Sequence, residues 1–274
     1  MKKIILSLSA LAILTFTACK KDDSAATADT AELIAVSSED MSEAESSTQS
    51  TENELDDILE ENGLKVRGCK PTVTLSAPKG KYPQTITMTF DGTCNDNNAR
   101  KRMGQIIITL SDSLTKTGAT KTVTYNNFVL DSTKVEGTRK WTNTGKNALG
   151  QPTFKREATN MKLTFGDGTF ATLSATHIVT KTQGYNTPLI FADDIWSVTG
   201  NTEGVNRKGK TFQSVISSPI IHKALCPWIT GGVRTITVND KTFSLDYSYG
   251  GGDCDREALL TLENGVTKVI KIRH

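Results

Sequence analysis

The side chains that could act as acids or bases are few and far apart in this sequence. The histidines are His177, His222 and His274, and none belongs to an HExxH pattern or a similar metal-binding arrangement. Asp193 and Asp194 are adjacent and could form a carboxylate pair for acid–base work, but an acidic turn before a strand is the favoured interpretation. The sequence contains no nucleophile elbow, phosphate-binding loop or dinucleotide fingerprint. We therefore predict no catalytic residue and no cofactor.

Oxygen-bearing side chains gather in the stretch from Asp91 to Asn98. Its two carboxylates, Asp91 and Asp96, could hold Ca²⁺, which prefers oxygen ligands. The stretch lacks the ligand spacing and the distant glutamate of an EF-hand loop, and Asn and Asp are also favoured in tight turns. A turn is the favoured interpretation, and a calcium site is the alternative.

Positive charge is the main chemical feature of the chain from residue 63 onwards. This part has 28 Lys and Arg against 16 Asp and Glu, a net charge of +12. One basic run consists of Arg100, Lys101 and Arg102, and another consists of Arg207, Lys208 and Lys210. Such a charge attracts polyanions, among them lipopolysaccharide and acidic glycans, whereas no motif predicts a specific nucleic-acid partner. A lysine-rich surface that only keeps the protein soluble is the alternative.

The five cysteines divide into Cys19 and a later set of four. Opposite residues of an antiparallel hairpin have a constant sum of residue numbers, and this rule places Cys69 opposite Cys94 and Cys226 opposite Cys254. An even set of four in an exported chain predicts disulfides, here two local ones. The rival interpretation, a zinc site, has no CxxC motif or nearby histidine to support it.

β-Strands are the elements that must position these residues. Thr, Val and Ile alternate with a period of two in ten stretches bounded by Gly, Asn, Asp and Pro, which is typical of half-buried antiparallel strands. The stretches are Thr72–Ala77, Thr85–Phe90, Gln105–Leu110, Thr120–Tyr125, Met161–Phe165, Thr169–Val179, Thr211–Ile216, Val233–Val238, Thr242–Tyr247 and Thr267–Ile272. We predict an all-β domain over residues 63–274: an antiparallel sandwich, barrel or curled meander. The two Cys-bounded units, 69–94 and 226–254, predict an internal hairpin repeat.

The first 18 residues have the pattern of a bacterial lipoprotein signal peptide. A basic start is followed by the apolar run Ile4–Phe16 and by small residues directly before Cys19. The run is shorter than the roughly 20 residues that a membrane span needs. Cys19 is therefore predicted to carry a lipid that holds the protein at a membrane, and an ordinary secretory signal is the alternative.

Residues 19–62 are predicted to form an acidic, disordered tether between the lipid and the domain. The stretch 20–62 has 14 acidic and 2 basic side chains, a net charge of −12, and few large apolar ones. Such a composition buries too little apolar surface to offset the entropy of ordering. Leu55, Ile58 and Leu59 nevertheless lie at helical spacing, so a short helix over Glu52–Glu61 could pack against the domain.

The chain resembles a set of uncharacterised cell-surface lipoproteins of Bacteroidota. Besides the signal, the likeness is carried by Phe90–Cys94, Arg102–Thr109, Lys134–Arg139, Cys226–Ile229 and Gly252–Cys254, and Lys21–Asp23 resembles the surface-export signal of that group. The resemblance implies a lipid-anchored protein of the outer membrane, exposed at the cell surface and open to an outer-membrane protein partner. Retention at the periplasmic face is the alternative location.

These features together predict an exported, lipid-anchored surface protein that acts as a binding or structural module for polyanionic ligands. The alternative from another class is a surface hydrolase that acts on glycan or peptide. A hydrolase should present at least two titratable side chains that converge in a cleft. The sequence shows no clear pair of that kind.

Overall fold

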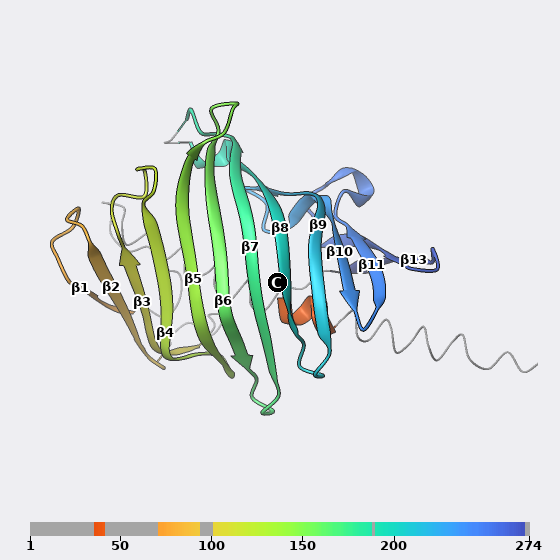
Figure 1. Cartoon of the computed structure of the whole chain (residues 1–274), viewed down its shortest axis with the longest axis horizontal. Helices are drawn as coiled ribbons and strands as arrows, with labels where there is room; N and C mark the ends of the chain where they lie inside the picture. The colour runs from red at the N-terminus through yellow and green to blue at the C-terminus, as the bar shows by residue number, and fades with distance from the viewer. Residues whose placement is uncertain (1–35, 42–70, 94–100, 188–189, 272–274) are drawn as a thin grey trace, which may run out of the picture.

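The computed structural model describes residues 36–41, 71–93, 101–187 and 190–271 (Figure 1). In these residues, thirteen antiparallel strands pair in sequence order into one sheet. This is the strand order of a meander, so the predicted all-β antiparallel fold is confirmed. The sheet is open, and β1 and β13 form its two edges.

The strands vary in length from four to fourteen residues, and the longest stand in the middle of the sheet (Figure 1). They are β1 (Thr72–Leu75), β2 (Gln84–Asp91), β3 (Arg102–Leu110), β4 (Thr120–Leu130), β5 (Thr133–Lys146), β6 (Pro152–Thr164), β7 (Phe170–Gln183), β8 (Ile195–Val205), β9 (Thr211–Lys223), β10 (Ile229–Val238), β11 (Lys241–Asp246), β12 (Glu257–Leu262) and β13 (Thr267–Lys271). Two short 3-10 turns, η1 (Phe191–Asp193) and η2 (Tyr249–Gly251), and a helix over 36–41 accompany the sheet.

One face of the sheet, here called the inner face, carries the core. In β2 the side chains of Ile86, Met88 and Phe90 are buried, whereas the threonines between them are partly exposed. Successive residues of a strand point to opposite faces, so the alternation of apolar residues with threonine in the sequence becomes one buried and one wet face. Full burial of each such apolar side chain stabilises the fold by about 1.5–3 kcal/mol.

Gly104 in β3 allows the backbone of Asn126 and Asn127 in β4 to approach closely. Its φ is +92°, and a Cβ at this position would lie 2.1 Å from the carbonyl oxygen of Asn127. Phe90 is opposite Gly104 in the ladder, and its ring centroid lies 5.8 Å from that of Phe128 in β4. A residue with a side chain at position 104 would therefore disturb the β3–β4 ladder.

All ten predicted strand stretches overlap strands of the structure, but β5, β8 and β12 were not predicted. In β5 and β8 the regular apolar alternation is interrupted on the inner face by Arg139, Gly200 and Thr202. β12 contains Leu259 and Leu260 in succession, which hides the period of two. Polar or small residues at inward positions therefore concealed β5 and β8, and the two adjacent leucines concealed β12.

The helix over 36–41 lies within the stretch that was predicted to be a disordered tether. It packs on the turn between β8 and β9, where Ser37 and Asp40 are both 0 % exposed. The remaining residues of the predicted tether, with the helix suggested over Glu52–Glu61, lie outside the described residues. No helix among the described residues has the length and apolar character that crossing a membrane requires.

An ion pair holds the helix in place. Asp40 Oδ1 accepts a hydrogen bond from Nε of Arg207 at 2.6 Å and forms an ion pair with its Nη2 at 2.5 Å, and Oδ2 accepts a hydrogen bond from the Arg207 backbone N at 2.8 Å. Asn206 Nδ2 donates to Ser37 Oγ at 3.0 Å. The guanidinium of Arg207 also lies 3.7 Å from the ring centroid of Phe165. Burial raises the pKa of Asp40 above its usual value, although the hydrogen bonds and charge of Arg207 oppose this shift.

Candidate functional site

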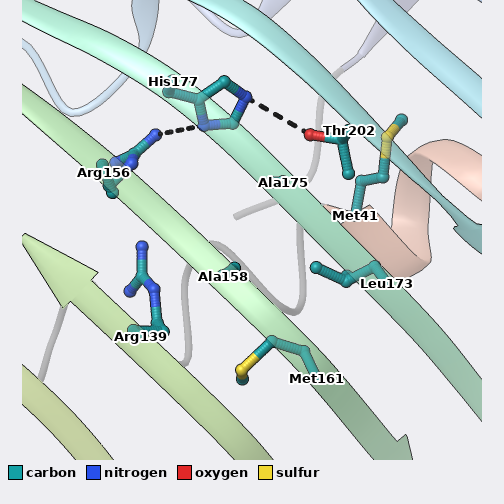
Figure 2. A pocket seen from close by; sticks show the side chains of 9 residues that line it. All are labelled: Met41, Arg139, Arg156, Ala158, Met161, Leu173, Ala175, His177 and Thr202. Carbon is teal, nitrogen blue, oxygen red and sulfur yellow. Dashed lines mark hydrogen bonds between the residues drawn. The ribbon is translucent and has the colours of Figure 1, made fainter.

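A group of polar side chains interrupts the apolar inner face in the middle of the sheet. Arg139, Arg156, His177 and Thr202, which we call the inner-face cluster, come from the four consecutive strands β5, β6, β7 and β8. Figure 2 shows them around one hollow. Arg139, His177 and Thr202 are only 4–6 % exposed. Strand pairing alone assembles the cluster, since Arg156 is directly opposite His177 in the β6–β7 ladder.

Both ring nitrogens of His177 take part in hydrogen bonds. Nη2 of Arg156 lies 3.2 Å from Nδ1, and Oγ1 of Thr202 lies 3.3 Å from Nε2 (Figure 2). A guanidinium can only donate, so Nδ1 is the acceptor. The imidazole is then neutral, with its proton on Nε2 and directed at Thr202. Its position is fixed from both sides.

Gly200 leaves room for this imidazole. It is opposite His177 in the β7–β8 ladder and has a φ of +126°. A Cβ at position 200 would lie 2.1 Å from the carbonyl oxygen of Thr176 and 3.0 Å from Cδ2 of His177. The glycine is therefore a steric requirement of the cluster.

The hollow beneath the cluster is small and mainly apolar. Its volume is about 30 Å³, which is room for about one or two water molecules. The hollow exists because the side chains of Ala158 and Ala175 are short. Its walls include Met161, Leu173 and, from the helix, Met41. None of the described residues that line it carries a carboxylate.

Two further cations and an aromatic row extend the polar part of the inner face. Nζ of Lys121 and Cζ of Arg156 lie 5.2 and 5.5 Å from the ring centroid of Trp141. The rings of Trp141, Phe154 and Trp196 follow one another at 6.4 and 6.3 Å, and Lys181 Nζ is 5.5 Å from Trp196. Cations over aromatic faces gain about 0.5–2 kcal/mol each, which offsets part of the cost of burying them.

The cluster supplies hydrogen-bond donors and positive charge, which is the chemistry of anion recognition. Arg139 and Arg156 carry fixed charges, and planar guanidinium groups bind carboxylates and phosphates through two parallel hydrogen bonds. Acid–base catalysis requires a partner that takes up or releases protons, whereas arginine stays protonated. The arrangement is therefore suited to holding an anionic group.

The structure does not bring the two predicted basic runs together. Lys101 and Arg102 lie at the start of β3, and Arg207, Lys208 and Lys210 lie at the β8–β9 turn, five strand spacings or roughly 24 Å along the sheet. Burial lowers the pKa of Arg102, whose guanidinium lies 5.6 Å from the ring of Phe90. Arg207 is bound to Asp40. Arg100 lies outside the described residues.

The proposed calcium ligand Asp91 is part of a local turn. Its Oδ1 accepts hydrogen bonds from the backbone N and from Oγ1 of Thr93 at 2.8 and 2.7 Å. These bonds lower the pKa of Asp91 below its usual value. Asp96 lies outside the described residues. The described part of the chain contains no group of three or more His, Cys, Asp or Glu side chains that could hold a metal ion.

Asp193 and Asp194 make separate contacts at the β7–β8 connection. Asp194 Oδ2 lies 2.7 Å from Nζ of Lys181, and Oδ2 of Asp193 accepts a hydrogen bond from Oγ1 of Thr187 at 2.7 Å. Asp193 ends the turn η1, and β8 begins directly after Asp194. The favoured interpretation, an acidic turn before a strand, agrees with this arrangement.

One of the two predicted disulfides is confirmed. Cys226 and Cys254 are bonded, with their Cα atoms 5.6 Å apart; Cys226 lies in the β9–β10 connection and Cys254 in the β11–β12 connection. This pair joins the two ends of one hairpin, as the constant residue sum predicted. The other pair, Cys69 and Cys94, and the predicted lipid site Cys19 lie outside the described residues.

Sequence reasoning placed His177 in no motif and did not recognise the cluster around it. Arg139, Arg156 and His177 are far apart in the sequence, and only the register of β5–β7 makes them neighbours. A signal was available, because Arg139 and His177 interrupt the apolar positions of their strands. It could be used only after the strands were paired.

Comparisons with known proteins do not identify a relative. No family model, no curated protein and no solved structure matches this chain. The likeness to lipoproteins of Bacteroidota stays a prediction.

Proposed function

We propose that this chain is an exported, lipid-anchored surface protein whose sheet acts as a binding or structural module for anionic ligands. The signal pattern that ends at Cys19 supports export and lipid attachment. The Cys226–Cys254 bond supports export independently, because disulfides persist mainly in oxidising compartments.

The inner-face cluster is the observation that carries the binding function. Arg139 and His177 replace apolar side chains in the centre of the core, where polar groups reduce stability. Sites that break the rules of a stable core are often sites of function. Since the hollow is lined by cations and apolar groups without a carboxylate, the described residues favour anion binding over the alternative, glycan or peptide hydrolysis.

The docked helix defines how far the domain can lie from its anchor. Only residues 20–35 separate Cys19 from the helix over 36–41, and 16 residues span at most about 53–58 Å when fully extended. A lipid on Cys19 would therefore keep the docked helix within about that distance of the membrane surface. In this position the sheet can bind lipopolysaccharide, acidic glycans or an outer-membrane protein partner.

Replacing the lipid site tests the anchoring. Cys19→Ala should move the protein from the membrane fraction to the soluble fraction of the cell envelope, because no acyl chain can then be attached. A Ser7→Ala variant within the signal peptide is the matched control and should stay in the membrane fraction. If the Cys19→Ala protein remains membrane-bound, the lipoprotein assignment is wrong.

Protease treatment of intact cells tests the orientation. A surface-exposed protein should be degraded by added protease, whereas a periplasmic one should be degraded only after the outer membrane is permeabilised. Protection in intact cells would replace the surface location by the periplasmic alternative.

A further inference from the structure

The carboxylate of Asp40 is bound like a ligand by the turn between β8 and β9. Arg207 contacts both of its oxygens, Oδ1 through the guanidinium and Oδ2 through the backbone N. Beside it, Nδ2 of Asn206 donates a hydrogen bond to Oγ of Ser37. Residues three apart lie on one face of a helix. The turn therefore contacts a serine and an aspartate that one face of the helix over 36–41 presents together.

The turn is closed by its own groups. Backbone hydrogen bonds join Asn206 N to Lys210 O and Gly209 N to Asn206 O. Oδ1 of Asn206 also accepts hydrogen bonds from the backbone N of Lys208 and of Lys210, both at 3.0 Å. Such side-chain contacts fix a turn locally. The donors that contact the helix are therefore in place whether the helix is docked or not.

The side chain of Arg207 also has a support that does not involve the helix. Its Cζ lies 3.7 Å from the ring centroid of Phe165, which begins the β6–β7 turn. Asp167 of that turn attracts the guanidinium, but its Oδ1 accepts two hydrogen bonds from Thr169. The guanidinium is therefore oriented before a carboxylate binds it, which lowers the entropic cost of binding.

The helix is joined to this turn by contacts that another molecule can take over. They include hydrogen bonds and one ion pair, and the helix belongs to no ladder of the sheet. When a carboxylate or hydroxyl is replaced by the same group of another molecule, the donors stay satisfied and the net cost is small. A preformed site that holds an exchangeable group is what displacement requires.

We propose that the β8–β9 turn is a receptor for an acidic peptide segment of a protein partner, and that the chain's own helix occupies it as an internal competitor. Arg207 and Asn206 form the receptor, which recognises a serine followed three residues later by an aspartate. A peptide is favoured over other anions because the bound carboxylate is itself part of a peptide helix. A partner has to displace the helix, so it binds more weakly while the helix is docked.

Displacement of the helix also opens the hollow of the inner-face cluster. Met41 follows Asp40 directly and is one wall of that hollow (Figure 2). When the helix leaves the turn, this side chain withdraws with it, and Arg156 and His177 become more accessible to an anion. This consequence rests on the proposed anion binding by the cluster, whereas the peptide site at the turn does not.

Fluorescence anisotropy of a dye-labelled peptide with the sequence of residues 34–43 tests the receptor. The peptide is titrated with the full-length soluble Cys19→Ala protein, with and without Asp40→Ala. The protein with Asp40→Ala should bind at least about tenfold more tightly, because its own helix no longer competes at the millimolar effective concentration of a tethered group. Equal affinity for both proteins would overturn the internal competition.

Matched changes in the Asp40→Ala protein test which groups bind the peptide. Arg207→Gln should weaken binding at least about tenfold, because the paired contact with the carboxylate is lost. Lys210→Gln removes the same charge from the same turn and should change the affinity by less than about twofold. A peptide that itself carries Asp40→Ala should not bind. Equal loss with both cation variants, or equal binding of both peptides, would overturn the assignment.

Hydrogen exchange of residues 36–41 tests displacement in the soluble protein that retains Asp40, and it decides the question if the Asp40→Ala protein does not fold. These amides exchange when the helix leaves the turn. Added peptide, which its dye distinguishes by mass, should accelerate them in proportion to its concentration, about twofold when that concentration equals the Kd for the vacant turn. No acceleration, or the same acceleration by the Asp40→Ala peptide, would overturn the proposal.

A uronic-acid oligosaccharide distinguishes a peptide partner from an acidic glycan. It presents carboxylates without the serine or the helical backbone. The unlabelled peptide should displace the labelled one from the Asp40→Ala protein at a lower carboxylate concentration than the oligosaccharide does. Displacement by the oligosaccharide at an equal or lower concentration would overturn the peptide assignment. The reporter is the peptide at the turn, so this result does not depend on the inner-face cluster.

Discussion

The inner face of this sheet has a mainly apolar region and a region where polar side chains interrupt the apolar ones. At β2–β4 the inward positions carry Ile86, Met88, Ile106 and Ile108, all fully buried. At β5–β8 they carry the inner-face cluster around a hollow. Both regions belong to one continuous sheet, in which every strand pairs with the strands next to it in the sequence. The difference between them therefore lies in the side chains and not in the backbone architecture.

The two regions contribute differently to stability. Apolar side chains at β2–β4 gain about 1.5–3 kcal/mol each on burial. A buried polar or charged group at best recovers the cost of its dehydration through hydrogen bonds and opposite charges. We infer that apolar burial at β2–β4 raises the free energy of unfolding, whereas the burial of charged hydrogen-bond donors at β5–β8 lowers it.

The largest effect is expected from a cavity at β2–β4. Ile106 is 0 % exposed and lies between Met88 and Tyr125 in the ladder. Ile106→Ala should reduce the free energy of unfolding by about 2–5 kcal/mol, because the surrounding side chains cannot close the space. Urea denaturation measures this change. The outer-face variant Ile107→Ala is the control and should cost clearly less.

A smaller effect is expected from removing polar groups at β5–β8 together. Arg156→Leu with His177→Leu replaces both partners of one hydrogen bond by apolar side chains. The free energy of unfolding should stay within about 1.5 kcal/mol of the wild-type value, because no partner of this bond is left behind. His177→Leu alone should be the more destabilising change by urea denaturation. A double variant that loses as much stability as Ile106→Ala would contradict the division into two regions.

The smallest effect concerns the ion pair that holds the helix over 36–41. Burial raises the pKa of Asp40, so the folded state binds this proton more tightly than the unfolded state. The resulting cost is fully present above the folded-state pKa and is removed as the pH falls below it. Asp40→Asn avoids the charge and retains an oxygen acceptor for Arg207. The variant should therefore be at least as stable as the wild type at pH 7.

The pH dependence of that difference is the measurement. Urea denaturation at pH 7 and at pH 4 should show the advantage of the Asp40→Asn variant decreasing at the lower pH, where Asp40 of the wild type takes up its proton. An advantage that grows as the pH falls would have the wrong sign. It would show that the carboxylate is stabilised, not destabilised, in the folded protein.

The same two regions explain what could be predicted from the sequence. β2 was predicted because Ile86 and Met88 alternate with threonines that point outward. β3 was predicted because Ile106 and Ile108 have the same spacing of two residues, although Ile107 between them is also apolar. β5 and β8 were missed because Arg139, Gly200 and Thr202 occupy inward positions. The residues that make the candidate site are thus those that concealed its strands. Local patterns report burial, whereas a polar site on an inner face depends on the register between distant strands.

The predicted disulfide and the predicted basic runs show the same limit. Cys226 and Cys254 were paired correctly because a single hairpin relates them, so local sequence spacing was sufficient. The basic runs were read as exposed clusters. Arg207 instead binds Asp40, which lies 167 residues earlier in the chain. No local pattern could have indicated that contact.

Retention on heparin tests the central claim, that the polar region of the inner face recognises anions, most directly. Arg139→Gln with Arg156→Gln and Lys140→Gln with Lys155→Gln remove the same charge from opposite faces of β5 and β6. In the soluble Cys19→Ala protein, the first pair should elute at a clearly lower salt concentration than the second. Equal elution of the two cation variants would contradict the claim, since the basic side chains would then act only through net charge.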